Sequence, residues 1–322
     1  MAIPDTSLEA SVSLDSIRLT SDTISDRVTL GQVAEELPWL IQQQVYAWHD
    51  SGFSPNYDIP PLSVNGGDPY NINAGNYFDW ALLESGDLVV EITNEFPMDI
   101  ASVDFVVENA SDNSQIANVI ITDIERHTTK SEVVALDGKY MESDLIGYVN
   151  ALNLDTLFAH TEIDTGAQYV DIDVVLRDLV ADSAKAVFPE QTVINSESRV
   201  RWDFGDLGIE LTEIKVKSGK LKVSAYSDIG NPMEFIYRLP SAIKDGQIVE
   251  VTTQLGAGSP GNPAVYSTDF DLSGYQIGLT ITGDSVNLFP QHFIGNLIYT
   301  GQSVEISDQN RIDIEYELVD IV

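Results

Sequence analysis

The residues of this chain that could do chemistry are its carboxylates and its four histidines. Carboxylate pairs such as Asp171 with Asp173 lie on candidate strands, where a half-exposed sheet places charges for solubility alone. The histidines are scattered and show no H-E-x-x-H or similar close spacing, which a metal site would use: His49, His127, His160 and His292. We therefore predict no catalytic residues and no enzyme.

A glycine-rich motif at residues 256–261 satisfies G-x-G-x-x-G. A dinucleotide site requires this motif between a strand and a helix N-terminus that faces the pyrophosphate. Here Pro260 and Pro263 accompany the motif and a candidate strand follows, so we predict a hairpin loop. Ser259 lacks the G-x-S-x-G frame of a nucleophile elbow.

Calcium is the metal that the composition favours, because hard cations bind clustered Asp and Asn side chains and carbonyl oxygens in loops. Loops of this kind are residues 112–114 and 203–206. The EF-hand pattern is absent from the sequence. We predict no cofactor and keep a calcium ion as the open alternative.

The charge balance is strongly acidic, with 51 Asp and Glu residues against 16 Lys and Arg residues and a formal net charge of -35. Such a chain repels phosphates, so we expect neither a nucleic acid partner nor binding to anionic membrane surfaces. The sequence contains no cysteine, which excludes disulfides, thiolate nucleophiles and Cys-ligated zinc. It has no apolar run long enough to predict a transmembrane span.

The basic residues are unevenly placed, since eight of the sixteen fall between Arg199 and Lys244. One hypothesis is a docking surface for an acidic face of another copy or for an anionic glycan. The other is protection of an exposed sheet edge against aggregation. Four of these residues surround a Ser-Gly turn and form the candidate surface: Lys215, Lys217, Lys220 and Lys222.

Aromatic residues crowd the N-terminal portion, and the tryptophans Trp39, Trp48 and Trp80 are the candidate ligand cluster. Such rings can stack on a sugar or on an apolar ligand. They can equally cap the end of a sandwich core beside a helix. The sequence leaves both interpretations open.

The elements that position these residues are mostly strands, and they occur twice. Two stretches about 130 residues apart match, which predicts a tandem pair of domains. The matching segments are Ser85–Val90 with Ser218–Val223, Leu136–Tyr140 with Leu272–Tyr275, and Tyr169–Leu176 with Arg311–Leu318.

Alternating apolar residues predict short strands throughout, one of them running through Val200, Trp202 and Phe204. Thr29 and Gln32 form a capping box that opens a helix over residues 30–51, with Pro38 at the start of its second part. The sequence therefore predicts an all-β fold of two tandem antiparallel β-sandwich repeats. We place N-terminal strands, helix and a Pro/Gly/Asn-rich loop at 1–76, the first sandwich at 77–184 and the second at 185–322.

Three segments carry a resemblance to a known group of proteins: Ile3–Glu9, Val28–Gln32 and Asn94–Ile100. They resemble uncharacterised cell-envelope lipoproteins of Bacteroidota bacteria. The resemblance implies an envelope location and β-domains, and the repeats also resemble the LEA type 2 β-sandwich. The chain differs from the lipoproteins in lacking an N-terminal leader and a lipid-bearing Cys, so we expect a mature envelope or extracellular protein.

Three functions remain open on the sequence. The first is a non-enzymatic structural or protein-binding role in the cell envelope or outside the cell, with another protein or a second copy as partner. The second is a carrier of lipid or another apolar ligand, with the helix at residues 30–50 as a lid over an opened β-sandwich. The third is glycan binding at the surface.

Overall fold

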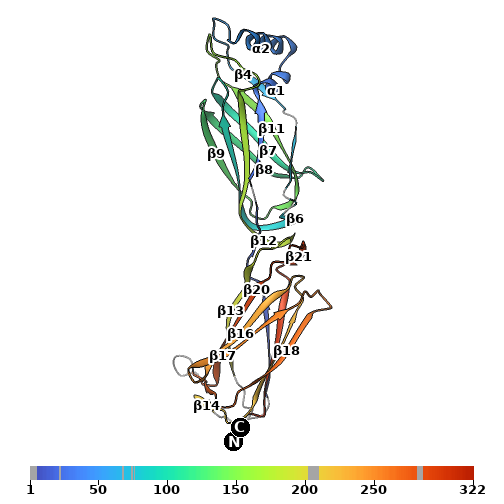
Figure 1. The fold of residues 1–322 in the computed structure, drawn as a ribbon, viewed down its shortest axis with the longest axis vertical. Helices are drawn as coiled ribbons and strands as arrows, with labels where there is room; N and C mark the ends of the chain where they lie inside the picture. The colour runs from blue at the N-terminus through green and yellow to red at the C-terminus, as the bar shows by residue number, and fades with distance from the viewer. Residues whose placement is uncertain are drawn as a thin grey trace. The chain divides into compact units, whose positions relative to one another are not determined.

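The computed structural model describes residues 6–21, 23–66, 69–73, 75, 77–201, 210–280 and 286–322 (Figure 1). Strands dominate it, the main strands pair antiparallel, and the predicted all-β sandwich class is confirmed. Of the strand predicted through Val200, Trp202 and Phe204, Val200 lies in a strand. Trp202 and Phe204 lie outside the described residues. No helix in these ranges is long and apolar enough to cross a membrane.

The chain divides into two compact units. Unit 1 comprises Met1–Ile17 and Val187–Val322, and unit 2 comprises Arg18–Ala186. The chain therefore starts in unit 1, completes unit 2 and then returns to unit 1. A short strand, β2 (Ile17–Arg18), lies where the chain passes between them.

Unit 2 consists of two helices, α1 (Leu30–Glu35) and α2 (Trp39–Ser51), and two sheets. The first sheet has the order β3-β12-β6-β9, with the short β10 also on β6, and the second has β4 and β5 side by side along β11, followed by β7 and β8. The strands are β3 (Thr23–Thr29), β4 (Leu62–Asn65), β5 (Tyr70–Asn73), β6 (Phe78–Asn94), β7 (Ile100–Asn109), β8 (Gln115–Ile124), β9 (Thr128–Ala135), β10 (Tyr140–Glu142), β11 (Asp144–Leu154) and β12 (Tyr169–Ala186).

Unit 1 repeats this arrangement, with one sheet in the order β1-β22-β15-β18 and the other built on β13-β20-β16-β17. Short strands β14 and β19 extend the second sheet, and β21 lies just before β22 in the chain. The strands are β1 (Thr6–Ser13), β13 (Gln191–Arg201), β14 (Glu213–Lys215), β15 (Lys220–Ser227), β16 (Met233–Lys244), β17 (Gln247–Leu255), β18 (Ala264–Asp271), β19 (Gln276–Gly278), β20 (Leu288–Leu297), β21 (Val304–Ser307) and β22 (Arg311–Val319).

The strand order identifies each unit as a jelly roll. If the main strands of a unit are numbered along the chain and β4 with β5 counts as one, the sheets have the orders 1-8-3-6 and 2-7-4-5 in both units. This is the double Greek key of an eight-stranded jelly roll. The first strand of unit 1 is β1 and that of unit 2 is β3, and each pairs with the last strand of its own unit.

The matched sequence segments occupy matched positions in the two units. Leu88 pairs with Leu176 across β6 and β12, and Leu221 pairs with Leu318 across β15 and β22. The Leu136 amide donates a hydrogen bond of 2.8 Å to the Gly86 carbonyl, and the Leu272 amide donates one of 2.9 Å to the Gly219 carbonyl. The internal repeat is therefore a duplication of one fold.

The helical segment begins as predicted but is broken. Gln32 donates its backbone N–H to the Thr29 hydroxyl (3.2 Å) and accepts from the Thr29 amide (2.8 Å), which completes the capping box of α1. The helix stops at Glu35, and α2 begins after Pro38, whose ring has no N–H for a continuous helix. Helix α2 buries Val45, whereas Leu40 in its first turn is 68% exposed.

The Ser-Gly pair that both repeats share gives a test of the fold, although the predicted turn is absent from the first repeat, where Gly86 lies within β6. Gly219 has φ +144°, and a Cβ there would lie 3.0 Å from the Ile321 Cα and 3.1 Å from the Asp320 carbonyl oxygen. We expect Gly219→Ala to lower the free energy of unfolding of unit 1 by about 2–4 kcal/mol, measured by urea denaturation. Gly256→Ala, where a Cβ meets nothing within 4 Å, is the matched control and should leave it unchanged. Equal effects of the two substitutions would contradict this account of the close contacts at Gly219.

Candidate functional site

A cavity of about 360 Å³, partly open to solvent, lies in unit 2 below α1 and between the edge strands of the two sheets. Small-molecule sites usually have volumes of roughly 300–1,000 Å³. The edge strand β3 borders it on one side, and the edge formed by β4 and β5 on the other. Its lining residues are Asp26, Val28, Gln32, Val33, Glu35, Glu36, Val64, Pro69, Tyr70, Phe96, Val103, Val149, Leu152, Val170 and Ile172.

The cavity coincides with irregularities in the second sheet. The edge of that sheet is not one strand, because β4 ends at Asn65 and β5 begins at Tyr70. Beside this interruption, the register of β11 against β7 shifts between Val149 and Ala151, as in a β-bulge. A bulge bends its strand and re-aims the side chains beside it, so the sandwich is not closed by regular pairing at this point.

Most of the wall is apolar, since aliphatic side chains from six elements meet there with one phenyl ring. Val170 and Ile172 come from the inner face of β12, and Val103 from β7. All three are at least 96% buried. The interior can therefore accept a hydrocarbon surface and gain the free energy of removing it from water.

Tyr70 is the polar exception within this wall. Its ring stacks on Phe105 at 6.0 Å between centroids, over Gly147, where a Cβ would lie 2.9 Å from the Tyr70 Cζ. Only a glycine leaves room for the ring at that position. The Tyr70 hydroxyl is buried and has no hydrogen-bond partner in the part of the chain that the structure describes. Burial, together with the charges of Asp26 and Asp173, raises the pKa of Tyr70, so the hydroxyl keeps its proton.

The charged residues of the lining are all acidic: Asp26, Glu35 and Glu36. Successive side chains of a strand point to opposite faces. Arg27 points outward, where it binds Asp171 at 2.7 and 2.8 Å and covers the Tyr169 ring at 3.6 Å, so Asp26 points inward to the cavity. Glu35 and Glu36 come from the end of α1 and are exposed.

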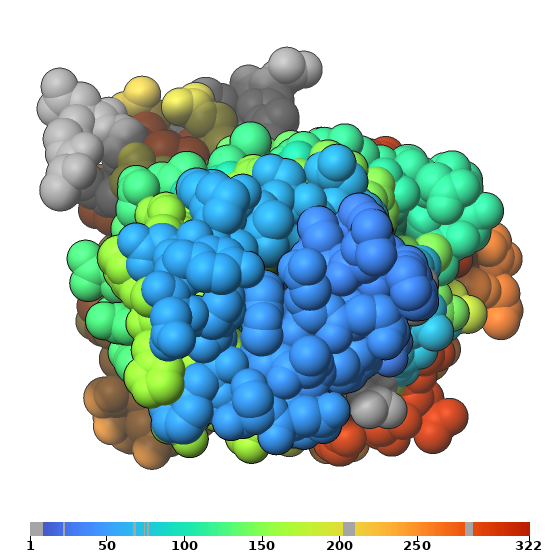
Figure 2. Space-filling view, turned by 90° about the horizontal axis from the view of Figure 1, so that it is seen from above, coloured from blue at the N-terminus to red at the C-terminus, as the bar shows by residue number. Residues whose placement is uncertain are grey.

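Helix α1 is held over the cavity by the segment that precedes β12. The Leu30 amide donates to the Gln168 carbonyl at 2.8 Å, and the Gly31 amide donates to the Thr165 carbonyl at 2.9 Å. Helices α1 and α2 also border a second, small apolar pocket, whose lining includes Val33, Leu37 and Trp48. Viewed from above, the blue residues of α1, α2 and the chain after them cover this end of unit 2 (Figure 2).

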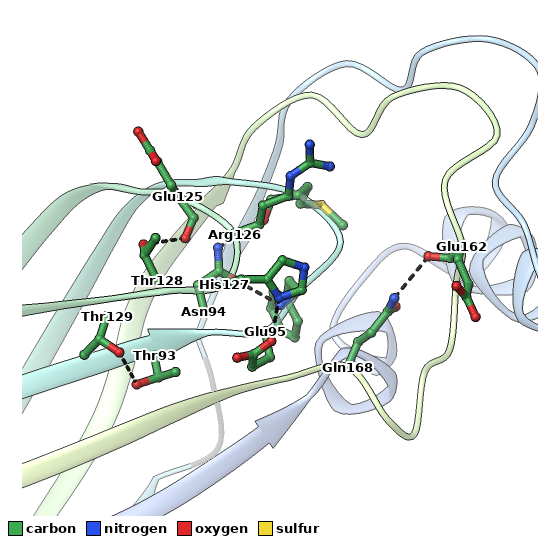
Figure 3. A network of polar contacts seen from close by, with 12 residues as sticks. Thr93, Asn94, Glu95, Glu125, Arg126, His127, Thr128, Thr129, Glu162 and Gln168 are labelled. Atoms are coloured by element: carbon green, nitrogen blue, oxygen red, sulfur yellow. Dashed lines mark hydrogen bonds and ion pairs between the residues drawn. The ribbon is translucent and has the colours of Figure 1, made fainter.

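A polar network beside the cavity fixes the turns that hold Phe96 (Figure 3). The Asn94 side chain donates to the carbonyls of Met98 and Ile124, both at 3.1 Å, and accepts from the Phe96 amide at 2.9 Å. His127 contacts the Glu95 carboxylate at 2.6 Å on the exposed side. Asn94 is fully buried, so this network positions the Phe96 ring in the cavity wall.

The structure splits the four candidate docking lysines between the two sheets of unit 1. Lys220 and Lys222 lie on one face of β15, whereas Lys215 lies on β14 of the other sheet and Lys217 in the connection between these strands. The amines of the first two lie 3.3 Å from Asp269 and 3.1 Å from Glu317, respectively. Ion pairs as exposed as these contribute little to stability.

The three candidate tryptophans do not form one cluster. Trp39 and Trp48 are both on α2, and Trp39 is 66% exposed. Trp80 stacks on Tyr140 at 6.2 Å, near the beginning of β6. The helices lie beyond the other end of that strand, so roughly 40 Å of strand separate Trp80 from them.

The remaining candidates for metal or cofactor chemistry stay apart. Within the described ranges, no group of three or more His, Asp or Glu residues could hold a metal ion. Asp112 accepts a hydrogen bond from the Ser114 amide at 2.9 Å. Hydrogen bonds with the side chain and the backbone of Ser114 lower the pKa of Asp112. The other candidate calcium loop, 203–206, is outside the described residues. The glycine-rich motif joins β17 to β18, which belong to different sheets, so the predicted hairpin was wrong.

Sequence reasoning missed the two residues that give the cavity its polarity, Asp26 and Tyr70. Asp26 carried a signal, because it interrupts the apolar face that Ile24 and Val28 form on one strand. Tyr70 carried only a general signal, as one of the aromatic residues that crowd the N-terminal portion.

No family model matches the chain, and no curated protein matches it. Among solved structures, it is similar to a protein from Parabacteroides distasonis described as secreted, with 11% identity over 97% of this chain and 99% of that one and a TM-score of 0.24. The tandem CBM22-1–CBM22-2 domain of Paenibacillus barcinonensis Xyn10C shares 11% identity over 97% and 100%, with a TM-score of 0.20. A structure of broad bean stain virus shares 8% over 83% and 90%, with a TM-score of 0.23. Because these scores are so low, we draw nothing from them about function.

The unpartnered hydroxyl of Tyr70 gives a prediction about stability. Tyr70→Phe removes a buried polar group that makes no hydrogen bond, so we expect the free energy of unfolding of unit 2 to stay within about 0.5 kcal/mol or to rise. Tyr237→Phe is the comparison, because the buried Tyr237 hydroxyl donates to Gln291 at 3.3 Å. That change should cost unit 1 about 1–2 kcal/mol. Urea denaturation measures both, and a loss of 1 kcal/mol or more in Tyr70→Phe would show that its hydroxyl has a partner.

Proposed function

We propose that this chain is a non-enzymatic binding protein whose unit 2 holds a small apolar molecule in the cavity below α1. The observation that carries the proposal is the cavity itself, about 360 Å³ of largely apolar space between the edge strands of unit 2 and partly open to solvent. A concave, mostly apolar space of this volume with a few polar groups is typical of small-molecule sites.

Helix α1 is the lid of the proposed site. It has six residues, and an isolated helix of that length is unstable in water. Its position therefore depends on the capping box and on its contacts with Gln168 and Thr165. Breaking these few bonds would uncover the cavity without disturbing either sheet. The lid expected from the sequence was the whole helix at residues 30–50, and in this proposal only α1 has that role.

The proposal also includes where the protein is located. The resemblance of three segments to cell-envelope lipoproteins supports a place in the cell envelope or outside the cell. A ligand carrier there would take up a molecule that dissolves poorly in water. A structural or protein-binding role for the remaining surface, as expected from the sequence, stays a prediction.

The proposal is tested with N-phenyl-1-naphthylamine, a neutral apolar dye whose fluorescence rises in apolar surroundings. We expect the wild-type protein to bind it, and Val149→Phe, which places a ring in the cavity, to weaken binding at least about tenfold. Val133→Phe makes the same change on β9 of unit 2, where the side chain is 45% exposed, and should bind as the wild type does.

Thermal unfolding of each variant shows whether it is folded. If Val149→Phe unfolds early, Val28→Phe on the edge strand fills the same cavity and replaces it. Dye binding that is unchanged in a folded cavity-filled variant, or absent from the wild type, would refute the proposed function.

A further inference from the structure

The carboxylate of Asp26 is the most unusual group in the cavity. It is half-buried, and it lies on the inner face of β3 between Ile24 and Val28, where a jelly roll ordinarily carries an apolar side chain. Among the described residues, no Lys, Arg or His forms an ion pair with it. A carboxylate beside apolar surface is unfavourable unless a cation or hydrogen-bond donors accompany it.

The Tyr70 hydroxyl is the second group without a partner. It comes from the edge strand opposite β3, and both residues line the same cavity. A protonated hydroxyl still has oxygen lone pairs that accept a hydrogen bond. Asp26 and Tyr70 together therefore present two acceptors to whatever fills the space between the edge strands.

The remaining charges of the lining have the same sign as Asp26. Glu35 and Glu36 stand at the end of α1, and the lining contains no basic side chain. The whole chain carries a formal net charge of -35, which has the same sign. A cleft lined by one sign of charge concentrates ligands of the opposite sign and repels those of its own sign.

We propose that the ligand of this cavity is an apolar molecule with a single cationic amine, whose hydrocarbon body fills the space below α1 and whose ammonium group binds the Asp26 carboxylate and the Tyr70 hydroxyl. This inference rests on the proposed function and adds the chemical class of the ligand. An ammonium group has only donors, which complement two acceptors. A fatty acid would place its own carboxylate near those of Asp26, Glu35 and Glu36, which would repel it.

Three ligands with the same ten-carbon chain test the proposal: decylamine, decanol and decanoate. At pH 7 they are cationic, neutral and anionic, respectively. We expect each to displace the naphthylamine dye in the order decylamine, decanol, decanoate. The amine should bind at least about tenfold more tightly than the alcohol at low ionic strength.

Two charge-removing variants separate a local from a general effect of charge. Asp26→Asn should abolish the preference for decylamine over decanol while the alcohol binds as before. Glu132→Gln removes one charge from β9, the far edge of the same sheet, and should keep the preference. Tyr70→Phe, which is expected to fold normally, should weaken decylamine binding more than decanol binding.

The outcomes distinguish the two proposals. If decanol and decylamine bind equally well and Asp26→Asn changes nothing, the cavity binds apolar molecules but the amine inference is wrong. If decanoate binds most tightly, the amine inference is likewise wrong and the ligand is an anionic lipid. If neither the dye nor any of the three ligands binds, the proposed function itself fails.

Discussion

The pairing of β3 with β12 is the interaction on which the site depends. Seven residue pairs, from Thr29 opposite Tyr169 to Thr23 opposite Val175, fix which side chains of β3 face the interior. A slip of one residue would turn Asp26 outward and bring Arg27 into the sandwich, because side chains alternate along a strand. The same pairing ends at Thr29, the N-cap of α1, so strand register and lid position are set together.

The two jelly rolls show how one topology was used in two ways. In unit 1, Tyr316 takes the register position of Val174, and its ring stacks on Tyr237, which stacks in turn on Phe293. These rings are almost completely buried and fill the space between the sheets. In unit 2 the cavity lies instead beside Ile172 and Val170, which precede Val174 on the same face of β12. The connection from the first strand to the second differs as well. In unit 2 it consists of the helices and a loop. In unit 1 the chain forms the whole of unit 2 between the first strand, β1, and the second, β13.

Local features of this fold could be predicted from the sequence. The all-β class followed from alternating apolar residues, the capping box of α1 from Thr29 and Gln32, and the repeat from the matched segments around Gly86 and Gly219. These features depend on residues that are close in the sequence or on direct similarity. Alternation shows that a strand has two faces, but it does not identify the neighbouring strand.

The pairing of β1 with β22 and the cavity depend on contacts between distant residues, which carry no local signal. The β1 pairing joins Thr6 to Leu318. The cavity joins Asp26 of an edge strand to Tyr70 of a second edge and to side chains of β7, β11 and β12. No spacing motif marks such a set, since its members come together only when both sheets have formed.

The position of β1 also has a consequence during synthesis of the chain. Because β1 pairs with β22, it leaves the ribosome roughly 300 residues before its partner, a delay of about 15–60 s at ordinary translation rates. All of unit 2 is made in that interval, so it can fold while the opening strand of unit 1 still has unpaired backbone groups. An unpaired strand edge readily joins other chains. The nascent protein therefore has a period in which the unpaired backbone of β1 is open to pairing with a neighbouring polypeptide.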